Sequence, residues 1–425
     1  MRLPRVKAQH RPHRYGNDRI RIGGAAREIS DPDGHVWAAL NSMDGTRTPE
    51  EVAARLLRAF PGLTEAEATG VVDLLLKSGY VEDAAGPRPE ELSLRELERY
   101  SRNAAFFRGS GLAPREHGWE AQVRLKRSRV LVFGLGGTGS HTAWALAACG
   151  VGEIHCVDHD LVELSNLTRQ ALYREADIGS PKVDVAVARL AEVNSSVRVT
   201  GETRAVECEE DMLDLVRGFD AVAMCADEPA GRGGIRIWAN RACLSEKIPW
   251  ALGGYNGPLV SVAAFTPGGP CYECLTASVD APLAPGIPVD LGGPDVLAPS
   301  AGVSGHLTAQ AVIAFLTGIP AASGSYVTGI NLIAPDQHVY TRHPAAPDCP
   351  PALRTRSAPN PSAAWPGDRP RAAPDGQASG RPAPRSDSGR GPRMRRSLSS
   401  IGTSLMLASL RLISPSAVNS HSSLP

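Results

Sequence analysis

The sequence predicts an α/β fold with a doubly wound, mostly parallel sheet, preceded by a small α+β domain. Residues 130–133 form a short apolar run that leads directly into a glycine cluster and then into a helical apolar pattern. The short apolar pattern recurs at residues 153–157 and 219–225, and a helix ending at Val193 is expected between them. Strands that alternate with helices are typical of a Rossmann-like sheet with helices on both faces.

The composition is that of a soluble globular chain with two or three domains. Its 425 residues are 42% hydrophobic and carry no formal net charge, so charge gives no argument for binding nucleic acid or an anionic membrane. No apolar run reaches the ~18 residues of a transmembrane helix, and the basic N-terminus lacks the apolar core of a signal peptide. Eight scattered cysteines predict reduced thiols in the cytoplasm.

Residues 12–84 have the pattern of a separate small domain. Short β-like pieces between Arg14 and Ile29 are broken by turn signals, and three helical segments follow. Thr48 and Thr64 are N-cap candidates for the second and third helices, since each stands three residues before a glutamate. Small strands followed by three helices predict a winged-helix-like fold.

The third of these helices is expected to bury Val71, Leu74 and Leu75. Basic and acidic residues are nearly equal in number through residue 90, so this segment lacks the excess of basic residues that is typical of a DNA-binding domain. The pattern resembles the PqqD-type peptide-recognition domain of ribosomal-peptide biosynthesis, which binds a leader peptide by adding it to a sheet edge. A purely structural subdomain and a DNA-binding module are the alternatives.

Residues 85–95 form a linker that ends where a helix starts. Ser93 and Glu96 have the spacing of a capping box. The helix that follows carries Arg102, which taken alone has the character of a solvated helix residue. Residues 96–352 are expected to form the second domain.

A glycine-rich turn marks the nucleotide site of this second domain. Gly134, Gly136, Gly137 and Gly139 stand between a strand and a helix, the context in which a Gly-x-Gly-x-x-Gly pattern indicates a nucleotide. Glycines let the backbone approach phosphate closely, and the free N–H groups at the helix start, up to Ser140, favour an anion.

Polar side chains after the turn indicate which nucleotide is bound. Asp158 ends the next strand, where a carboxylate can bond a ribose hydroxyl. Asn166, Arg169, Gln170 and Lys182 follow within a short stretch, and cations with forked donors suit the anionic oxygens of a triphosphate. The alternative is that the two cations are ordinary surface residues.

Together these motifs resemble the ThiF/MoeB/HesA adenylyltransferases, bacterial relatives of ubiquitin-activating enzymes, over residues 100–349. The resemblance implies that ATP is the nucleotide, that Asp227 holds magnesium (Mg²⁺), and that Arg102 reaches the nucleotide of the partner subunit in a homodimer. The chain departs from the family pattern at Met224, where an acid is usual, and at Glu228, where Asn is common. The alternative for Asp227 is a helix N-cap.

Cys271 and Cys274 have the CxxC spacing of a zinc knuckle. The family resemblance implies a second pair, of which only Cys349 is present. His343 and Asp348 are close enough in sequence to supply the fourth ligand. A structural zinc ion and a decayed site of ordinary thiols both remain open, and no βαβ context of a redox-active pair surrounds the motif.

Two further segments carry predictions, one about where the reaction stops and one about the C-terminal tail. No cysteine lies between Cys274 and Cys349, where relatives that form a thioester or persulfide keep their nucleophile, so the reaction is expected to stop at the adenylate. His306 is expected at the start of a helix that runs through Leu316. Residues 353–425 are rich in Pro, Ala, Ser, Gly and Arg, which predicts a disordered tail.

The predicted function is ATP-dependent adenylation. The chain is expected to activate the C-terminal carboxylate of a peptide or small ubiquitin-like protein as acyl-AMP, in ribosomal-peptide natural product biosynthesis, with its N-terminal domain binding the leader peptide. The main alternative is a catalytically weakened scaffold that presents a leader peptide to another enzyme. An NAD-dependent oxidoreductase satisfies the glycine motif but does not account for residues 165–170.

Overall fold

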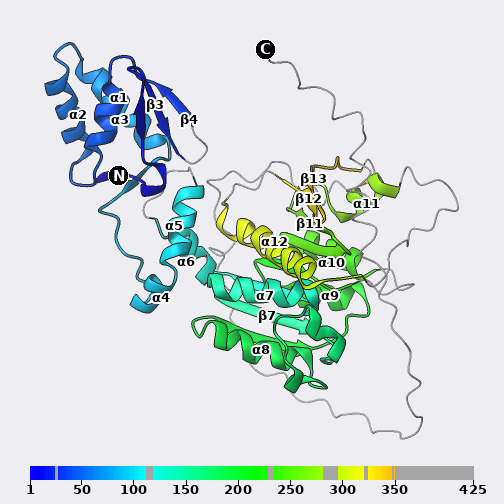
Figure 1. The fold of residues 1–425 in the computed structure, drawn as a ribbon. Helices are drawn as coiled ribbons and strands as arrows, with labels where there is room; N and C mark the ends of the chain where they lie inside the picture. Colours follow the sequence, from blue (N-terminus) through cyan, green and yellow to red (C-terminus); the bar gives the residue numbers. More distant parts are fainter. Residues whose placement is uncertain are drawn as a thin grey trace, which may run out of the picture.

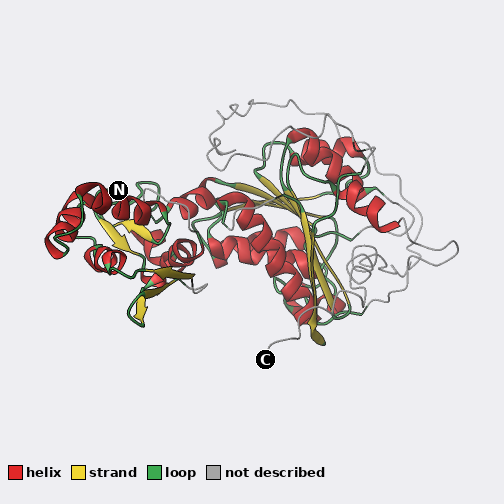
Figure 2. Cartoon of the chain, turned by 90° about the horizontal axis from the view of Figure 1, so that it is seen from above, coloured by secondary structure: helices red, strands yellow, loops and turns green. Residues whose placement is uncertain are grey.

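The computed structural model describes residues 1–23, 27–111, 118–227, 234–280, 295–319, 324–346 and 349. Glu228, Asp348 and the predicted disordered tail at 353–425 lie outside the described residues. The chain forms a small N-terminal lobe beside a larger α/β lobe (Figures 1 and 2). No helix in the described ranges is both long and apolar enough to cross a membrane.

The described residues of the N-terminal lobe form two small sheets and three α-helices. Strands β2, β3 and β4 form an antiparallel sheet in that order, and β1 pairs with β5. Its elements are β1 (Pro4–Val6), β2 (His13–Tyr15), β3 (Arg19–Ile22), β4 (Arg27–Ser30), α1 (His35–Ser42), α2 (Pro49–Ala59), α3 (Glu65–Lys77) and β5 (Val81–Asp83). The sequence held no signal for β1, because its only partner strand lies at the far end of the lobe's sequence.

Capping and periodicity account for the helices of this lobe. Thr48 and Thr64 each form a capping box with the glutamate three residues on, as their spacing predicted. In α3, Val72 and Leu75 are buried, whereas Leu74 is 65% exposed. The prediction that Leu74 faces the core is therefore wrong, because position 74 falls one residue off the helical stripe that 72 and 75 define.

Three helices connect the two lobes: α4 (Leu94–Arg99), α5 (Ser101–Ser110) and α6 (Glu120–Arg127). Ser93 caps α4 as predicted, but the helix is interrupted at Tyr100 before α5 begins. A short 3₁₀ turn, η1 (Ala8–His10), lies against α5, where Gln9 Nε2 donates to the Ala105 carbonyl at 3.1 Å. Helix α5 therefore contacts both lobes.

The larger lobe is built on an eight-stranded sheet with the order β13-β12-β11-β10-β9-β6-β7-β8. Strands β8, β7, β6, β9 and β10 are parallel, and β11 to β13 extend the sheet antiparallel at one edge. The bounds are β6 (Arg129–Phe133), β7 (Glu153–Asp158), β8 (Arg198–Thr203), β9 (Ala221–Met224), β10 (Trp250–Asn256), β11 (Leu259–Phe265), β12 (Tyr326–Asn331) and β13 (Ala334–Thr341). The predicted doubly wound, mostly parallel sheet is confirmed.

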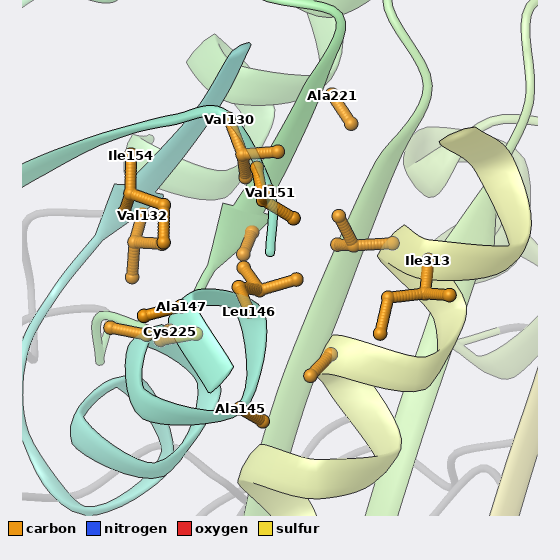
Figure 3. Packing of buried hydrophobic residues seen from close by; sticks show 14 of the residues in the cluster. Val130, Val132, Ala145, Leu146, Ala147, Val151, Ile154, Ala221, Cys225 and Ile313 are labelled. Atoms are coloured by element: carbon orange, nitrogen blue, oxygen red, sulfur yellow. The ribbon is translucent and has the colours of Figure 1, made fainter. Parts of the chain in front are cut away.

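Helices cover both faces of this sheet. Val130 and Val132 point toward α7, α8 and α12, while Leu131 and Phe133 point toward α9, α10 and α11. Figure 3 shows the first of these cores, where Leu146 and Ile313 pack near the strands. The helices are α7 (Gly137–Cys149), α8 (Lys182–Val193), α9 (Glu209–Val216), α10 (Ile235–Glu246), α11 (Tyr272–Asp280) and α12 (Ala298–Thr317), with 3₁₀ turns η2 (Leu164–Thr168) and η3 (Glu175–Asp177).

Helix α12 begins earlier than the sequence predicted. Its first residue is Ala298, and a proline stands in the first turn, where its fixed φ favours helix initiation. His306 consequently lies in the middle of the helix, so its predicted place at a helix start is wrong. Its ring is 5.9 Å from that of Trp144 and 5.8 Å from that of His141, both on α7.

Candidate functional site

The turn between β6 and α7 forms the floor of the candidate site. Gly134 has φ +89°, and a Cβ there would lie 2.6 Å from the backbone N of Ala226, beyond the end of β9. At Gly136, by contrast, the nearest atom to such a Cβ is Gln170 Nε2 at 3.8 Å. No side chain among the described residues caps the start of α7. The open space at Gly136 and the free N–H groups of the first turn therefore suit a phosphate.

Two residues assigned to the nucleotide by the sequence are engaged by the protein. The Ser140 hydroxyl donates to the Gly137 carbonyl at 3.2 Å and accepts from Ala171 N–H at 3.2 Å. Its backbone N–H donates to the Gly136 carbonyl at 3.0 Å. Gly137 is packed against Tyr255, whose Oη would lie 2.4 Å from a Cβ at that position. Ser140 and Gly137 therefore shape the turn.

The acid at the end of β7 lies beside the glycine turn. Asp158 is 8% exposed, and its carboxylate accepts from Leu135 N–H at 2.6 Å and from Asp160 N–H at 2.9 Å. These bonds fix the carboxylate next to the turn while each oxygen retains a lone pair for a ribose hydroxyl. The structure thus brings together the strand end and the turn as the sequence predicted.

Lys182 is buried at the start of α8. Only 5% of the residue is exposed, and its Nζ donates to Asp160 Oδ2 at 2.8 Å. Asp158, His159 and Asp160 each offer one atom that could bind a metal ion, and these three atoms lie within 4.8 Å of one another. The ammonium of Lys182 is therefore not an ordinary surface cation, because the exposed carboxylate of Asp160 holds it. Asp160 lies just beyond β7, in the region between the glycine turn and the carboxyl ends of β7 and β9, which is called the crevice below.

The segment after β7 contributes donors and acceptors that the protein does not satisfy. Asn166 is buried, and its Oδ1 accepts from Glu163 N–H at 3.0 Å. Arg169 Nη1 donates to the Ser165 carbonyl at 3.0 Å, whereas Arg169 Nε and Gln170 Oε1 are buried without a partner among the described residues. Buried polar atoms are almost always paired with protein or water, so these two atoms are available to a ligand or to water, and Gln170 lies next to the open position at Gly136.

Asp227 is exposed and lies three residues beyond the end of β9, next to Ala226 and the glycine turn. The following helix, α10, has Gly234 at its N-cap. Asp227 is therefore not the N-cap of α10. Met224, which stands where the family usually has an acid, is fully buried.

Arg102 lies away from the crevice of its own chain. It is exposed near the start of α5, and its neighbour Asn103 donates to the Cys149 carbonyl at 3.2 Å, at the C-terminal end of α7. The glycine turn is at the opposite end of that helix, thirteen residues away. Within one chain the structure does not bring Arg102 to the other candidate residues.

The three cysteines assigned to a metal lie together. The sulfurs of Cys271, Cys274 and Cys349 are within 4.8 Å of one another, and all three residues are buried. Burial raises the pKa of Cys271 to about 11. Burial opposes ionisation of Cys274 too, but hydrogen bonds from the Ala346 and Cys271 backbone and from the neighbouring thiols lower its pKa. A soft trio with one thiol predisposed to ionise fits zinc.

The fourth ligand of such a site is not among the described residues. His343 is buried, but its Nε2 contacts the carbonyl oxygen of Cys271 at 3.2 Å, and the ring is not among the clustered ligand atoms. His343 therefore supports the cluster through the backbone in this arrangement. Asp348, the other candidate from the sequence, lies outside the described residues.

Sequence reasoning missed two side chains at the crevice. Tyr255, near the end of β10, packs its Oη against Gly137, and burial raises its pKa, with Arg169 and Asp227 as the nearby charged groups. His141 on α7 bonds the Arg169 backbone; burial and the nearby His306 lower its pKa. A signal for Tyr255 existed, because ligands in parallel sheets bind at the carboxyl ends of strands.

The sequence of the larger lobe matches a known family. The sequence profile described as ThiF family matches residues 100–350, more than half of the chain. The chain belongs to the ThiF family. The predicted resemblance is thereby confirmed, and the larger lobe is of the ThiF/MoeB adenylyltransferase type.

Two curated relatives illustrate this membership. The molybdopterin-synthase adenylyltransferase of Escherichia coli K12 is 34% identical over 240 residues, which are 56% of this chain and 89% of that protein. The mouse adenylyltransferase and sulfurtransferase MOCS3 is 42% identical over 194 residues, 43% of this chain. The chain spans only 37% of the mouse protein's length.

Solved structures share the fold across both lobes. Escherichia coli MccB has a TM-score of 0.65 and 22% identity, covering 84% of this chain and 98% of MccB. MccB in complex with ATP has a TM-score of 0.63, also at 22% identity, covering 81% of this chain and 98% of that one. PaaA has a TM-score of 0.58 at 24% identity and covers 79% of this chain and 99% of its own. At these identities the likeness establishes the fold.

Proposed function

We propose that this ThiF-family protein uses ATP to activate the C-terminal carboxylate of a peptide or small ubiquitin-like protein as acyl-AMP, in the biosynthesis of a ribosomal-peptide natural product. The observation that carries the proposal is a pair of buried atoms without a partner among the described residues, Arg169 Nε and Gln170 Oε1, on neighbouring residues of which Gln170 lies next to the open position at Gly136. The relatives named as adenylyltransferases support the nucleotide, and the MccB structures with MccA peptide support the substrate class.

The reaction needs little more than positioning and charge neutralisation. A carboxylate oxygen of the substrate attacks the α-phosphorus of ATP and forms the new P–O bond. The bond to the bridging β-phosphate oxygen breaks, and pyrophosphate leaves with the electron pair. The first N–H groups of α7, Arg169 and Lys182 would hold the polyphosphate, and Asp158 the ribose.

Magnesium fits the crevice because Asp227 offers an exposed carboxylate, a hard oxygen ligand, at the end of β9. When bound there it would neutralise phosphate charge. Zinc fits the buried sulfur trio of Cys271, Cys274 and Cys349 and would tie the start of α11 to the segment near residue 349. The zinc role is structural and separate from the reaction.

The N-terminal lobe is proposed to bind the leader part of the substrate. In the described residues β2 and β4 pair only with β3, so each presents a row of unpaired backbone groups at an edge. An extended peptide can add to such an edge as a further strand. Replacing Glu28 of β4 with proline should weaken leader binding by about tenfold without reducing ATP binding, because the N–H of Glu28 faces the free edge: its pair with Arg21 lies between the hydrogen-bonded pairs that follow from the Asp31 N–H bond to the Asp18 carbonyl.

The proposal is tested by comparing a substrate peptide that has a free C-terminal carboxylate with the same peptide whose C-terminus is an amide. Full-length protein, ATP and magnesium are incubated with each short peptide encoded beside the gene, and AMP-linked peptide and released pyrophosphate are measured by mass spectrometry and a coupled assay. The acid form of the true substrate should release pyrophosphate, and its C-terminal amide should not. Peptide binding without pyrophosphate release would leave the scaffold alternative in place of catalysis.

A further inference from the structure

The N-terminal lobe meets the larger lobe where residues 7–10 pack on helix α5, and this contact is called the lobe junction below (Figure 1). Gln9 lies so close to Gly109 of α5 that a Cβ at Gly109 would be 3.2 Å from Gln9 Cγ. Lys7 Nζ donates to the Gly111 carbonyl at 3.0 Å. These contacts attach the segment to the last turn of α5 and to the residue that follows the helix.

His10, the last residue of η1, is buried at this junction. Only 5% of the residue is exposed, and neither Nδ1 nor Nε2 has a hydrogen-bond partner among the described residues. Its ring packs edge-on against the ring of Tyr80, with 5.3 Å between the centroids, and a Cβ at Gly23 would lie 3.1 Å from Nδ1. An imidazolium carries an N–H donor at both nitrogens, so these surroundings suit the neutral ring better than the charged one.

The charges around His10 also favour its neutral form. Burial is the largest cause that lowers the pKa of His10, and the Lys7 ammonium is the second; the backbone of Gly109 acts in the opposite direction but is the smallest of the three. Lys7 is itself buried, with 4% exposed. The neighbouring elements α5 and β5 bring Arg108 and Glu82, which pair at 3.7 Å, and a second arginine pairs with the same glutamate. This carboxylate is therefore already shared by two cations.

We propose that His10 is a pH-sensitive latch at the lobe junction: neutral His10 lets residues 7–10 stay packed on α5, and a proton on His10 releases them. Protonation places a second buried positive charge beside Lys7, and both charges regain water when the junction opens. An exposed histidine takes up its proton at about pH 6.5, whereas docked His10 does so only at a lower pH. The closed junction is therefore most stable above about pH 6.5, and it loses stability as the pH falls through the pKa of docked His10.

The latch goes beyond the proposed adenylation and does not depend on it, because its residues lie outside the crevice. Each lobe has a hydrophobic core of its own, so the junction can open while both lobes stay folded. The junction lies where the lobe that is proposed to bind the leader meets the helix that carries Arg102. Opening in a mildly acidic medium would release the N-terminal lobe from that helix.

The test is hydrogen–deuterium exchange of the full-length protein at about pH 7.5 and about pH 5.5, with labelling times corrected for the intrinsic exchange rate at each pH. Mass spectrometry follows the peptides that contain the amides of His10 and Gly111, which close the last turns of η1 and α5. These turns fray when the junction opens, so their corrected exchange should be several-fold faster at the lower pH. One histidine can give at most about tenfold at one pH unit below its ordinary pKa.

His10→Phe keeps a ring against Tyr80 but takes up no proton, so it should abolish the acceleration, and His10→Gln, a second neutral variant, should do the same. His13→Gln is the matched control: His13 is exposed on β2 of the same lobe, and its loss should leave the wild-type response unchanged. NMR titration of His10 in the wild-type protein keeps the proposal testable even where both variants pack poorly.

Four results would overturn the proposal. These are equal corrected exchange at both pH values in the wild-type protein, an undiminished response in both neutral variants, a His10 titration midpoint at or above about 6.5, and acceleration that extends through the cores of both lobes, which would be general acid unfolding. Faster exchange at the junction alone, lost in both neutral variants and kept in the His13 control, is the result that the latch predicts.

Discussion

Gly134 shows why the glycine turn constrains the sequence at single positions. Its φ of +89° is one that L side chains rarely adopt, and the space for a Cβ is occupied by the backbone of Ala226. The atoms that a Cβ would meet first belong to the backbone of Ala226, not to the flexible end of a side chain, so the structure has little room to adjust to an added side chain. The phosphate-approach argument from the sequence applies better to Gly136, where the space is open.

Gly134→Ala should lower the free energy of unfolding of the larger lobe by about 3 kcal/mol, because strain at a positive φ adds to a backbone clash. Chemical denaturation measures this value. Gly70→Ala is the control: Gly70 lies inside α3, and a Cβ added there would have no neighbouring atom within 4 Å. That change should stabilise the N-terminal lobe by about 0.5–1 kcal/mol, and an equal loss in both variants would contradict the account.

At the scale of single elements, the linker helix α4 is fixed by one carboxylate. Glu96 is 4% exposed; it closes the capping box with Ser93, and it pairs with Lys126 of α6 at 2.6 Å. Burial alone would raise the pKa of Glu96, but the hydrogen bonds from Lys126 and Ser93 outweigh burial and hold the pKa below its usual value. The stabilisation is therefore present at neutral pH and is lost as the pH falls through the pKa of the folded state.

Glu96→Gln should lower the free energy of unfolding by about 1–2 kcal/mol at pH 7, because it removes a charged bond to a partly buried lysine. The difference from wild type should shrink as the pH falls below about 4, where the unfolded carboxyl is protonated. Asp214→Asn, which breaks an exposed pair with Arg217, should change the stability by less than about 0.5 kcal/mol. A Glu96 effect that does not vary with pH would be inconsistent with the ion pair.

The cysteine cluster joins the start of α11 to a distant part of the chain. We expect the purified protein to hold one zinc ion, measured by mass spectrometry of the metal content, and Cys274→Ser to lose it. Removal of zinc by a chelator should lower the melting temperature by roughly 5 °C, because metal bound only to the folded state stabilises it. Cys208→Ser, outside the cluster, should keep the metal. Metal-free wild-type protein would favour the decayed site.

At the scale of the whole molecule, the position of Arg102 bears on whether the protein acts as a dimer. In one chain it lies at the far end of α7 from the glycine turn, so any action on the nucleotide requires a second copy. Such an arrangement gives a C2 dimer with two composite sites. A cation that reaches developing phosphate charge in a dry crevice can contribute several kcal/mol in the transition state.

Arg102→Ala and Lys182→Ala should each be nearly inactive as homodimers. After subunit exchange, a mixed dimer has one site with both lesions and one with neither. Random pairing makes about half the dimers mixed, so activity should recover toward about a quarter of wild type. A mixture that stays inactive despite demonstrated exchange would show that Arg102 does not act across an interface.

The sequence was informative where local chemistry decides the structure. The three capping boxes, the parallel strands around Gly134 and the position of Asp158 beside the glycine turn all follow from short motifs. Pairings between distant segments could not be predicted in this way, and these include β1 with β5 and the antiparallel extension of the sheet. Tyr255 belongs to the same class, since only the packed structure places it on Gly137.

The central claim, that the larger lobe forms an acyl-adenylate, is tested most directly by exchange of labelled pyrophosphate into ATP. Exchange requires reversible attack on the α-phosphorus and occurs in no mere binding protein. The account predicts exchange that depends on magnesium and on the peptide's free C-terminus, and a fall of about 100-fold or more with Lys182→Ala, since that ammonium would otherwise neutralise the polyphosphate. Peptide and ATP binding without exchange in the wild-type protein would contradict it.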